Sequence, residues 1–226
     1  FDYDYIDARE DEVIVNFKLL YAYAAMTPDE EEKYKKFTKS IQRRAATIGG
    51  NDINDYPLKM LIFNRARMVK NSKNRIPFGI ELLQKHKRDS WIVFTENKKQ
   101  AKEFNKIINT KGYKSAIYNT DLDNAEREEN LNNFKNGNLN VLVSCTALDE
   151  GFDMPEADGA MILSASSSKR QRIQRMGRVL RITANKQNAL IVTVYSSKTE
   201  FDKLREESNR YKLEGVPIKW QQMKQV

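Results

Sequence analysis

The chain has 226 residues, enough for one domain with a full hydrophobic core and some additional elements. Basic residues exceed acidic ones by a net charge of +8, although six acids lie within the first twelve residues. This surplus favours a polyanionic partner or serves solubility alone. No apolar run approaches the length of a membrane-spanning helix, and the single cysteine, Cys145, excludes an internal disulfide, so we expect a cytoplasmic protein without membrane contact.

The first 56 residues predict a strand, a helix and a linker. The apolar residues of VIVNFKLLYAYA, residues 13–24, alternate as in a strand. Thr27, Pro28 and Glu30 have the spacing of a helix N-cap, first position and capping-box partner. A stretch rich in Gly, Asn and Asp follows. We therefore expect an N-terminal extension at 1–56, a main domain at 57–211 and a C-terminal tail at 212–226.

A basic helix is predicted directly after the linker. Apolar residues recur there at helical spacing, namely Leu58, Leu61, Ile62, Met68 and Val69. Between Tyr56 and Ile80 six residues are basic and none is acidic. Such a helix either has a solvated side or contacts nucleic acid, and the sequence leaves both interpretations open.

From residue 90 onward, short apolar runs alternate with amphipathic helices. The runs are WIVF (91–94), AIY (116–118), VLVSC (141–145), AMIL (160–163) and ALIVTVY (189–195). Apolar runs without alternation are typical of strands covered by helices on both sheet faces. Their regular succession predicts an α/β fold with a parallel, doubly wound sheet. Ligands in such folds bind at the carboxyl ends of the strands.

Two segments near those strand ends carry polar residues suited to a nucleotide. The loop TALDEGFDMP, residues 146–155, follows a buried strand. Gly151 lets the backbone approach a ligand closely, Asp153 can accept from a sugar hydroxyl, and Thr146 can donate to a phosphate. A plain turn glycine is the alternative interpretation.

The second segment is QRIQRMGRVLR, residues 171–181. As a helix it places Gln171, Gln174, Arg178 and Arg181 within an arc of about 80°, with Arg175 beside them. Arginines in register on one face suit phosphate oxygens or carboxylates. The alternative is a solvated cationic helix, but the apolar residues between the arginines indicate a buried opposite side.

These motifs, in this order, resemble the second RecA-like domain of superfamily 2 helicases. The resemblance covers most of residues 57–211, and WIVFT (91–95), the 146–155 loop and QRMGRVLR (174–181) resemble the helicase motifs IV, V and VI. Within the superfamily, motif VI is similar to that of the xeroderma pigmentosum group B type of DNA repair helicases. The segments AMTPDEEEKY (25–34) and RIPFGIELL (75–83) point the same way. The implied fold is a RecA-like parallel sheet flanked by helices.

The resemblance implies catalytic roles for the arginine segment. Arg178 and Arg181 would be the arginine fingers that stabilise charge on the transferred phosphoryl group. Gln174 would help to close the interface between two lobes, and Arg175 would tie the helix to motif V or to the opposite lobe.

It also implies contacts with nucleotide and nucleic acid. Gly151 and Asp153 would lie at the nucleotide, with Asp153 at the ribose. Thr95 and Thr146 would touch the nucleic-acid backbone, assisted by the amino-terminal end of the helix that starts near Asn97.

A phosphate-binding loop is missing from the 226 residues, because none of the nine glycines is followed by lysine. We therefore expect ATP, with its Mg²⁺, to be held by a first RecA-like domain elsewhere in the same polypeptide, and this segment alone not to hydrolyse ATP. His86 has no neighbouring His or Cys at ligand spacing, so we expect no metal bound by this chain itself. The expected partner is DNA rather than RNA, and the oligomeric state stays open. Two alternatives remain: a non-catalytic nucleic-acid-binding module, and a restriction or remodelling translocase that does not separate strands.

Overall fold

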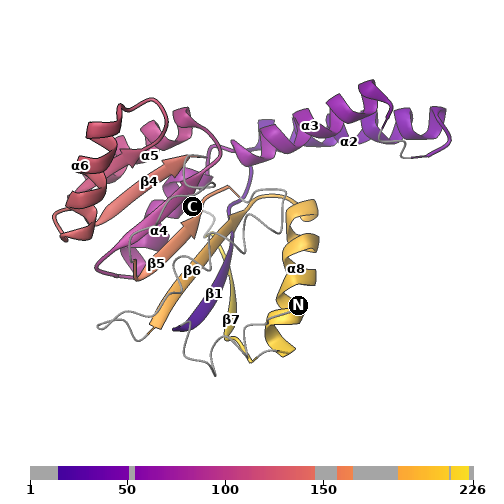
Figure 1. Ribbon diagram of the computed structural model, residues 1–226. Coiled ribbons are helices and arrows are strands. Elements are labelled where there is room, and N and C mark those ends of the chain that lie inside the picture. Colours follow the sequence, from indigo (N-terminus) through magenta and orange to yellow (C-terminus); the bar gives the residue numbers. More distant parts are fainter. Residues whose placement is uncertain (1–14, 51–53, 146–156, 165–187, 214, 224–226) are drawn as a thin grey trace.

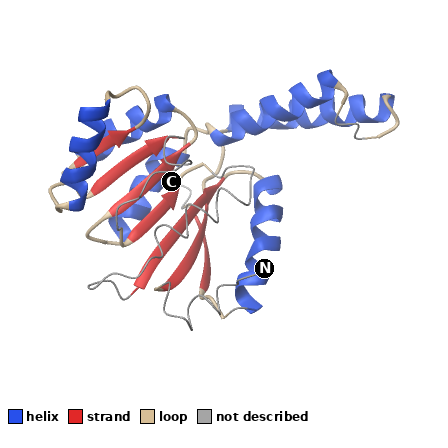
Figure 2. Cartoon of the chain, viewed as in Figure 1, coloured by secondary structure: helices blue, strands red, loops and turns tan. Residues whose placement is uncertain are grey.

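The computed structural model describes residues 15–50, 54–145, 157–164, 188–213 and 215–223. Seven strands form one sheet, and helices surround it (Figures 1 and 2). The strands are β1 (Asn16–Tyr23), β2 (Trp91–Thr95), β3 (Ser115–Tyr118), β4 (Val141–Cys145), β5 (Gly159–Ile162), β6 (Asn188–Tyr195) and β7 (Ile218–Gln222). The helices are α2 (Pro28–Thr47), α3 (Tyr56–Lys70), α4 (Arg75–Lys85), α5 (Lys98–Thr110), α6 (Asn124–Lys135) and α8 (Lys198–Leu213).

All strand pairs of the sheet are parallel, in the order β3-β4-β2-β5-β6-β1-β7. Successive residues of β2 point to opposite faces: Trp91 and Val93 belong to the buried cluster that contains residues of α4 and α5, whereas Ile92 and Phe94 belong to the cluster that contains residues of α6 and α8. Both faces are therefore covered, which explains why the central strands are continuously apolar. The predicted RecA-like, doubly wound architecture is confirmed.

Strands from both flanking segments belong to this sheet. Strand β1, from the segment that we assigned to an N-terminal extension, lies between β6 and β7, with Leu19 opposite Ile191. Strand β7, from the expected C-terminal tail, forms one edge. Leu19 to Ala22 are all buried because helices and neighbouring strands cover this part of β1 on every side. The domain boundaries stay a prediction, but the sheet is not complete without residues 16–23.

Helices α2 and α3 form a hairpin that extends away from the sheet, and we call it the arm (Figure 1). The predicted N-terminus of α2 is confirmed, since Thr27 and Glu30 form a capping box with Pro28 in the first turn. A second carboxylate oxygen of Glu30 accepts from the backbone N–H of Lys73 at 2.9 Å, which fixes the base of the arm. At the tip of the arm, the guanidinium of Arg44 donates two hydrogen bonds to the carboxylate of Asp55, the N-cap of α3.

Candidate functional site

Three strand ends define one edge of the sheet. Thr95 at the end of β2 lies opposite Cys145 at the end of β4, and Phe94 lies opposite Ile162 at the end of β5. The chain continues from Cys145 into residues 146–156 and from Ser164 into residues 165–187. The loop with Thr146, Gly151 and Asp153, and the segment with the predicted arginine fingers, therefore start from the edge at which β2 ends.

The connection from β2 to α5 is the β2–α5 corner, residues 95–100. Thr95 is buried, and its hydroxyl lies 3.1 Å from the carbonyl oxygen of Ser144 and 3.3 Å from that of Asn97. Asn97 is the N-cap of α5, and its side-chain oxygen accepts from the backbone N–H of Gln100 at 2.9 Å. The structure thus brings the predicted residues Thr95 and Asn97 together, with the Thr95 hydroxyl turned into the protein.

The corner is held against the end of α3 by side chains that the sequence analysis did not single out. Lys70 forms an ion pair with Glu96 at 2.9 Å. The side chain of Gln100 donates to the carbonyl of Lys70 at 3.2 Å, and the Ser164 hydroxyl lies 2.7 Å from the same oxygen. Asn97 donates to the side chain of Asn71, which ends α3. The base of the arm, the corner and the last described residue before 165 are therefore one connected unit.

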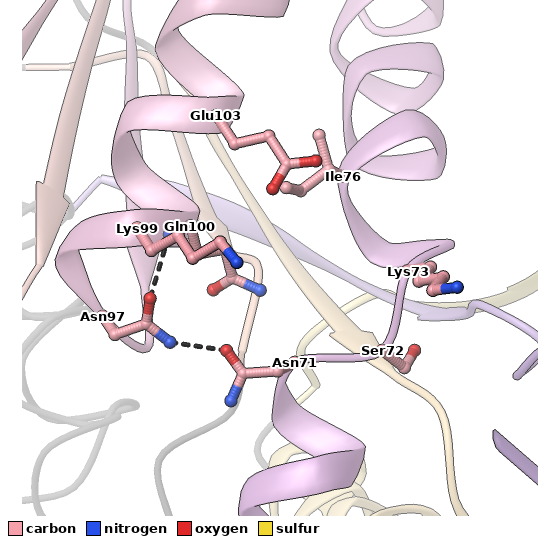
Figure 3. Close-up of a pocket in the computed structure, with 8 residues that line it drawn as sticks. All are labelled: Asn71, Ser72, Lys73, Ile76, Asn97, Lys99, Gln100 and Glu103. Atoms are coloured by element: carbon pink, nitrogen blue, oxygen red, sulfur yellow. Dashed lines mark hydrogen bonds between the residues drawn. The ribbon is translucent and has the colours of Figure 1, made fainter.

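A pocket of about 480 Å³ opens between the starts of α4 and α5 (Figure 3). Asn97 and Asn71 are hydrogen-bonded to each other at its wall, and the charged residues of its lining are Lys73, Lys99 and Glu103. A wider groove of about 790 Å³ runs on from it between the arm and α5. The groove is lined by Phe37, Asn64, Arg67, Met68, Asn71, Asn97, Lys98 and Lys99, and it contains no acidic residue. Pocket and groove share Asn71, Asn97 and Lys99.

The first turn of α5 breaks the usual charge preference of helices. A helix N-terminus carries partial positive charge and favours acidic residues, yet α5 begins with Lys98 and Lys99 and has no acid in its first turn. Lys98 is paired with Asp121, and this hydrogen bond, with the attraction of Lys98 and Lys102, holds the pKa of the Asp121 carboxyl below its usual value. Among the described residues Lys99 has no carboxylate partner. Backbone N–H groups and an unpaired ammonium at one helix end are suited to a phosphate.

Beneath the corner, a fully buried arginine joins four elements. Arg75 donates to the carbonyl oxygens of Val69 at 3.0 Å, Leu163 at 3.0 Å and Val194 at 2.7 Å. Its remaining amino group lies 2.6 and 2.7 Å from the two carboxylate oxygens of Glu200. The ends of α3, β5 and β6 and the start of α8 are thereby fixed relative to one another. In sequence this arginine looked like one of six basic residues of a surface stretch, and no local pattern marks it as buried.

The other predicted site residues lie outside the described residues. These are Thr146, Gly151, Asp153, Gln174, Arg175, Arg178 and Arg181. Their roles stay predictions. Among the described residues, no helix combines the length and the apolar character that a membrane crossing requires.

Comparison with known proteins agrees with this architecture. The sequence pattern of helicase conserved C-terminal domains matches residues 74–183. The chain is 28% identical to the DNA 3'-5' translocase XPB2 of Sulfurisphaera tokodaii over 202 residues, which cover 82% of this chain and 44% of that protein. It is 29% identical to the ATP-dependent RNA helicase DBP3 of Ajellomyces capsulatus over 164 residues, which cover 70% of this chain and 32% of that protein. The chain thus spans less than half the length of these curated relatives.

The solved C-terminal domain of the DEAD-box protein Dbp5 has the same fold, with a TM-score of 0.58 and 20% identity over 67% of this chain and 85% of that one. The sheet and its covering helices define a RecA-like α/β domain. The sequence match then specifies it further: the chain carries a superfamily 2 helicase C-terminal domain.

Proposed function

We propose that this domain is the second lobe of an ATP-driven DNA motor, and that the β2–α5 corner grips the nucleic-acid backbone. The observation that carries the proposal is the start of α5, where Lys99 has no carboxylate partner among the described residues and lines a groove that has no acid in its lining. A phosphate would supply the negative charge that this helix end lacks. The segments that resemble motifs V and VI leave the same sheet edge, next to the corner.

ATP would be bound between two lobes, with its phosphates and Mg²⁺ held by a first lobe of the same polypeptide. Arg178 and Arg181 would reach the phosphates when the lobes close, with Gln174 and Arg175 at the interface. Gly151 and Asp153 would line the nucleotide, and Thr146 would assist the corner at the nucleic acid. The 226 residues would therefore not hydrolyse ATP alone.

The buried Thr95 hydroxyl supports a modified role for that residue. Because the hydroxyl bonds backbone oxygens within the protein, Thr95 would position the corner rather than touch the strand itself. Asn97 lines both the pocket and the groove and is only half-buried, so it is the better candidate for a direct contact.

ATP hydrolysis by the full-length protein tests the arginine assignment. Arg181→Ala should lower kcat by about 10³-fold to 10⁵-fold, the usual contribution of an arginine finger. Arg172→Ala is the matched control, since in a helix this arginine of the same segment points away from the arc of Arg178 and Arg181. A loss of only a few-fold for Arg181→Ala, or an equal loss for Arg172→Ala, would contradict the assignment.

Nucleic-acid stimulation of the same activity tests the corner. Lys99→Ala should raise the DNA concentration needed for half-maximal stimulation and make that concentration less dependent on salt. Lys106→Ala is its control, because Lys106 is exposed on the same side of α5, two turns further on and about 10 Å away. Similar effects of both variants would assign the Lys99 effect to net charge alone.

The choice of DNA is supported by the match to a DNA translocase over a larger share of this chain than the match to an RNA helicase. Stimulation by RNA but not by DNA would overturn that choice. Displacement of a triplex-forming strand without separation of a duplex would identify a translocase that does not unwind.

A further inference from the structure

The outer side of α3 carries an alternating row of aromatic and basic side chains. Tyr56, Lys59, Phe63 and Arg67 fall within an arc of about 80° at 100° per residue. All four are exposed, Tyr56 to 70% and Phe63 to 56%. We call these four residues the α3 stripe.

Packing within the arm does not account for the stripe. Helix α3 packs on α2 through its opposite side, where Leu58 is buried and the Arg65 guanidinium lies over the Tyr34 ring, 5.4 Å from its centroid. The described residues contain four exposed large hydrophobic side chains, and three of them lie on α3: Tyr56, Ile62 and Phe63. Tyr56 and Phe63 lie on the stripe, whereas Ile62 lies about 100° around the helix from Phe63. Exposed aromatic side chains aligned on one side of a helix indicate a binding function.

The charges of the stripe select the class of partner. Lys59 and Arg67 have no ion-pair partner among the described residues, and no acid occurs between Tyr56 and Ile80. Unpaired cations separated by aromatic rings meet the two needs of a single nucleic-acid strand, whose phosphates attract cations and whose bases stack on rings. A duplex suits the row less well, because its base faces are already stacked.

We propose that the α3 stripe binds single-stranded nucleic acid, with Phe63 and Tyr56 stacking on bases and Lys59 and Arg67 contacting phosphates. The proposal rests on the proposed nucleic-acid contact at the β2–α5 corner and extends it along the arm. Arg67 belongs to both surfaces, since it also lines the groove that leads to Lys99. From Tyr56 to Arg67 the row is about 16 Å long at 1.5 Å per residue, enough for several nucleotides.

Fluorescence anisotropy tests the proposal without ATP. The 226-residue protein is titrated into a labelled thymidine oligonucleotide of about 16 nucleotides, and into an abasic strand of equal length. Phe63→Ala should weaken binding to the thymidine strand by about 5-fold to 150-fold, the usual contribution of one stacked base, and leave binding to the abasic strand unchanged. Phe63→Trp should restore the affinity.

The basic residues of the α3 stripe should affect binding in a different way from the aromatic ones. Lys59→Ala should weaken binding to both strands alike and reduce the slope of log affinity against log salt concentration by about 0.7. Leu213→Ala is the control for loss of an exposed hydrophobic side chain, because Leu213 is 87% exposed on α8, far along the chain from the arm. It should change neither affinity.

Three results would overturn the proposal: no binding of the unaltered protein to either strand, wild-type affinity of Phe63→Ala, or an equal loss on both strands. A dimer that Phe63→Ala abolishes, with strand binding unchanged, would assign the stripe to contact between two copies of the chain. Failure of the stripe leaves the motor proposal standing, since the Arg181 and Lys99 variants test that separately.

Discussion

Replacement of Arg75 by methionine tests how strongly the sheet edge depends on one buried side chain. Arg75 is fully buried and bonds three backbone carbonyls and the carboxylate of Glu200. The methionine side chain has about the volume of the aliphatic part of arginine, but it donates no hydrogen bond. The Val69 carbonyl keeps a second donor, the backbone N–H of Ser72 at 3.1 Å, whereas the carbonyls of Leu163 and Val194 and the carboxylate of Glu200 lose the guanidinium.

Breaking a buried ion pair on one side typically costs about 3 to 5 kcal/mol. The Glu200 side chain stays 16% exposed and keeps the backbone N–H of Ser196 as a donor, so the lower figure applies, about 3 kcal/mol. That is a large part of the 5 to 15 kcal/mol that is typical of a folded protein, as an order of magnitude. With a urea m-value of about 2.5 kcal/mol/M, the unfolding midpoint should fall by about 1 M.

Urea unfolding followed by circular dichroism measures this shift. The control is Lys36→Met, which breaks the exposed pair of Lys36 with Glu32 and should change stability by less than about 0.5 kcal/mol. In the double variant Arg75→Met/Glu200→Met the orphaned carboxylate is gone, so this protein should be more stable than Arg75→Met alone. A midpoint of Arg75→Met within about 0.2 M of the unaltered protein would refute the reasoning.

Three further variants probe the packing and the ionisable groups. Gly159→Ala should cost about 1 to 3 kcal/mol in urea unfolding, because its Cβ would lie 2.6 Å from the Trp91 ring, and a neutral result would show that the ring can shift. Burial, and then repulsion by Tyr23, raises the pKa of Tyr195 to about 12, so Tyr195→Phe should remove an ultraviolet titration step near pH 12 and not one near pH 10. The folded protein favours the protonated, neutral form of the Tyr195 hydroxyl. The contribution of this group to the free energy of unfolding is therefore complete below pH 10 and is lost as the pH rises towards 12. Burial, followed by the charges of Lys85, Lys219 and Arg88, lowers the pKa of His86 below its usual 6.5, so stability should fall as the pH drops below 6.5, and His86→Gln should flatten that slope.

Local patterns predicted the elements of this fold well, because each depends on neighbours in sequence. The apolar runs 91–94, 116–118, 141–145, 160–163 and 189–195 coincide with β2 to β6. The capping box of Thr27 and Glu30 is present, and Gly112 and Gly137 have positive φ values where helices end.

Long-range partners could not be predicted in the same way. Whether residues 16–23 form a separate extension or a strand inside the sheet depends on pairing with residues 188–195 and 218–222, which no local pattern encodes. The buried position of Arg75 could not be predicted either, since its partner Glu200 is 125 residues away in sequence. At the candidate site the sequence indicated Asn97 and the start of α5, but the contacts of Asn71, Gln100 and Ser164 depend on tertiary packing.

The charge at helix starts connects the sequence to the proposed site. Helices α2, α6 and α8 each carry acid in the first turn, as the helix dipole favours. Helices α4 and α5 carry none, and the pocket opens between the starts of these two helices. A departure from a local preference is expected where function requires it. Beside these two helix starts Lys73 and Lys99 have no ion-pair partner among the described residues, and a polyanion lying from the β2–α5 corner to the arm would add negative charge to that of Glu103, which also lines the pocket.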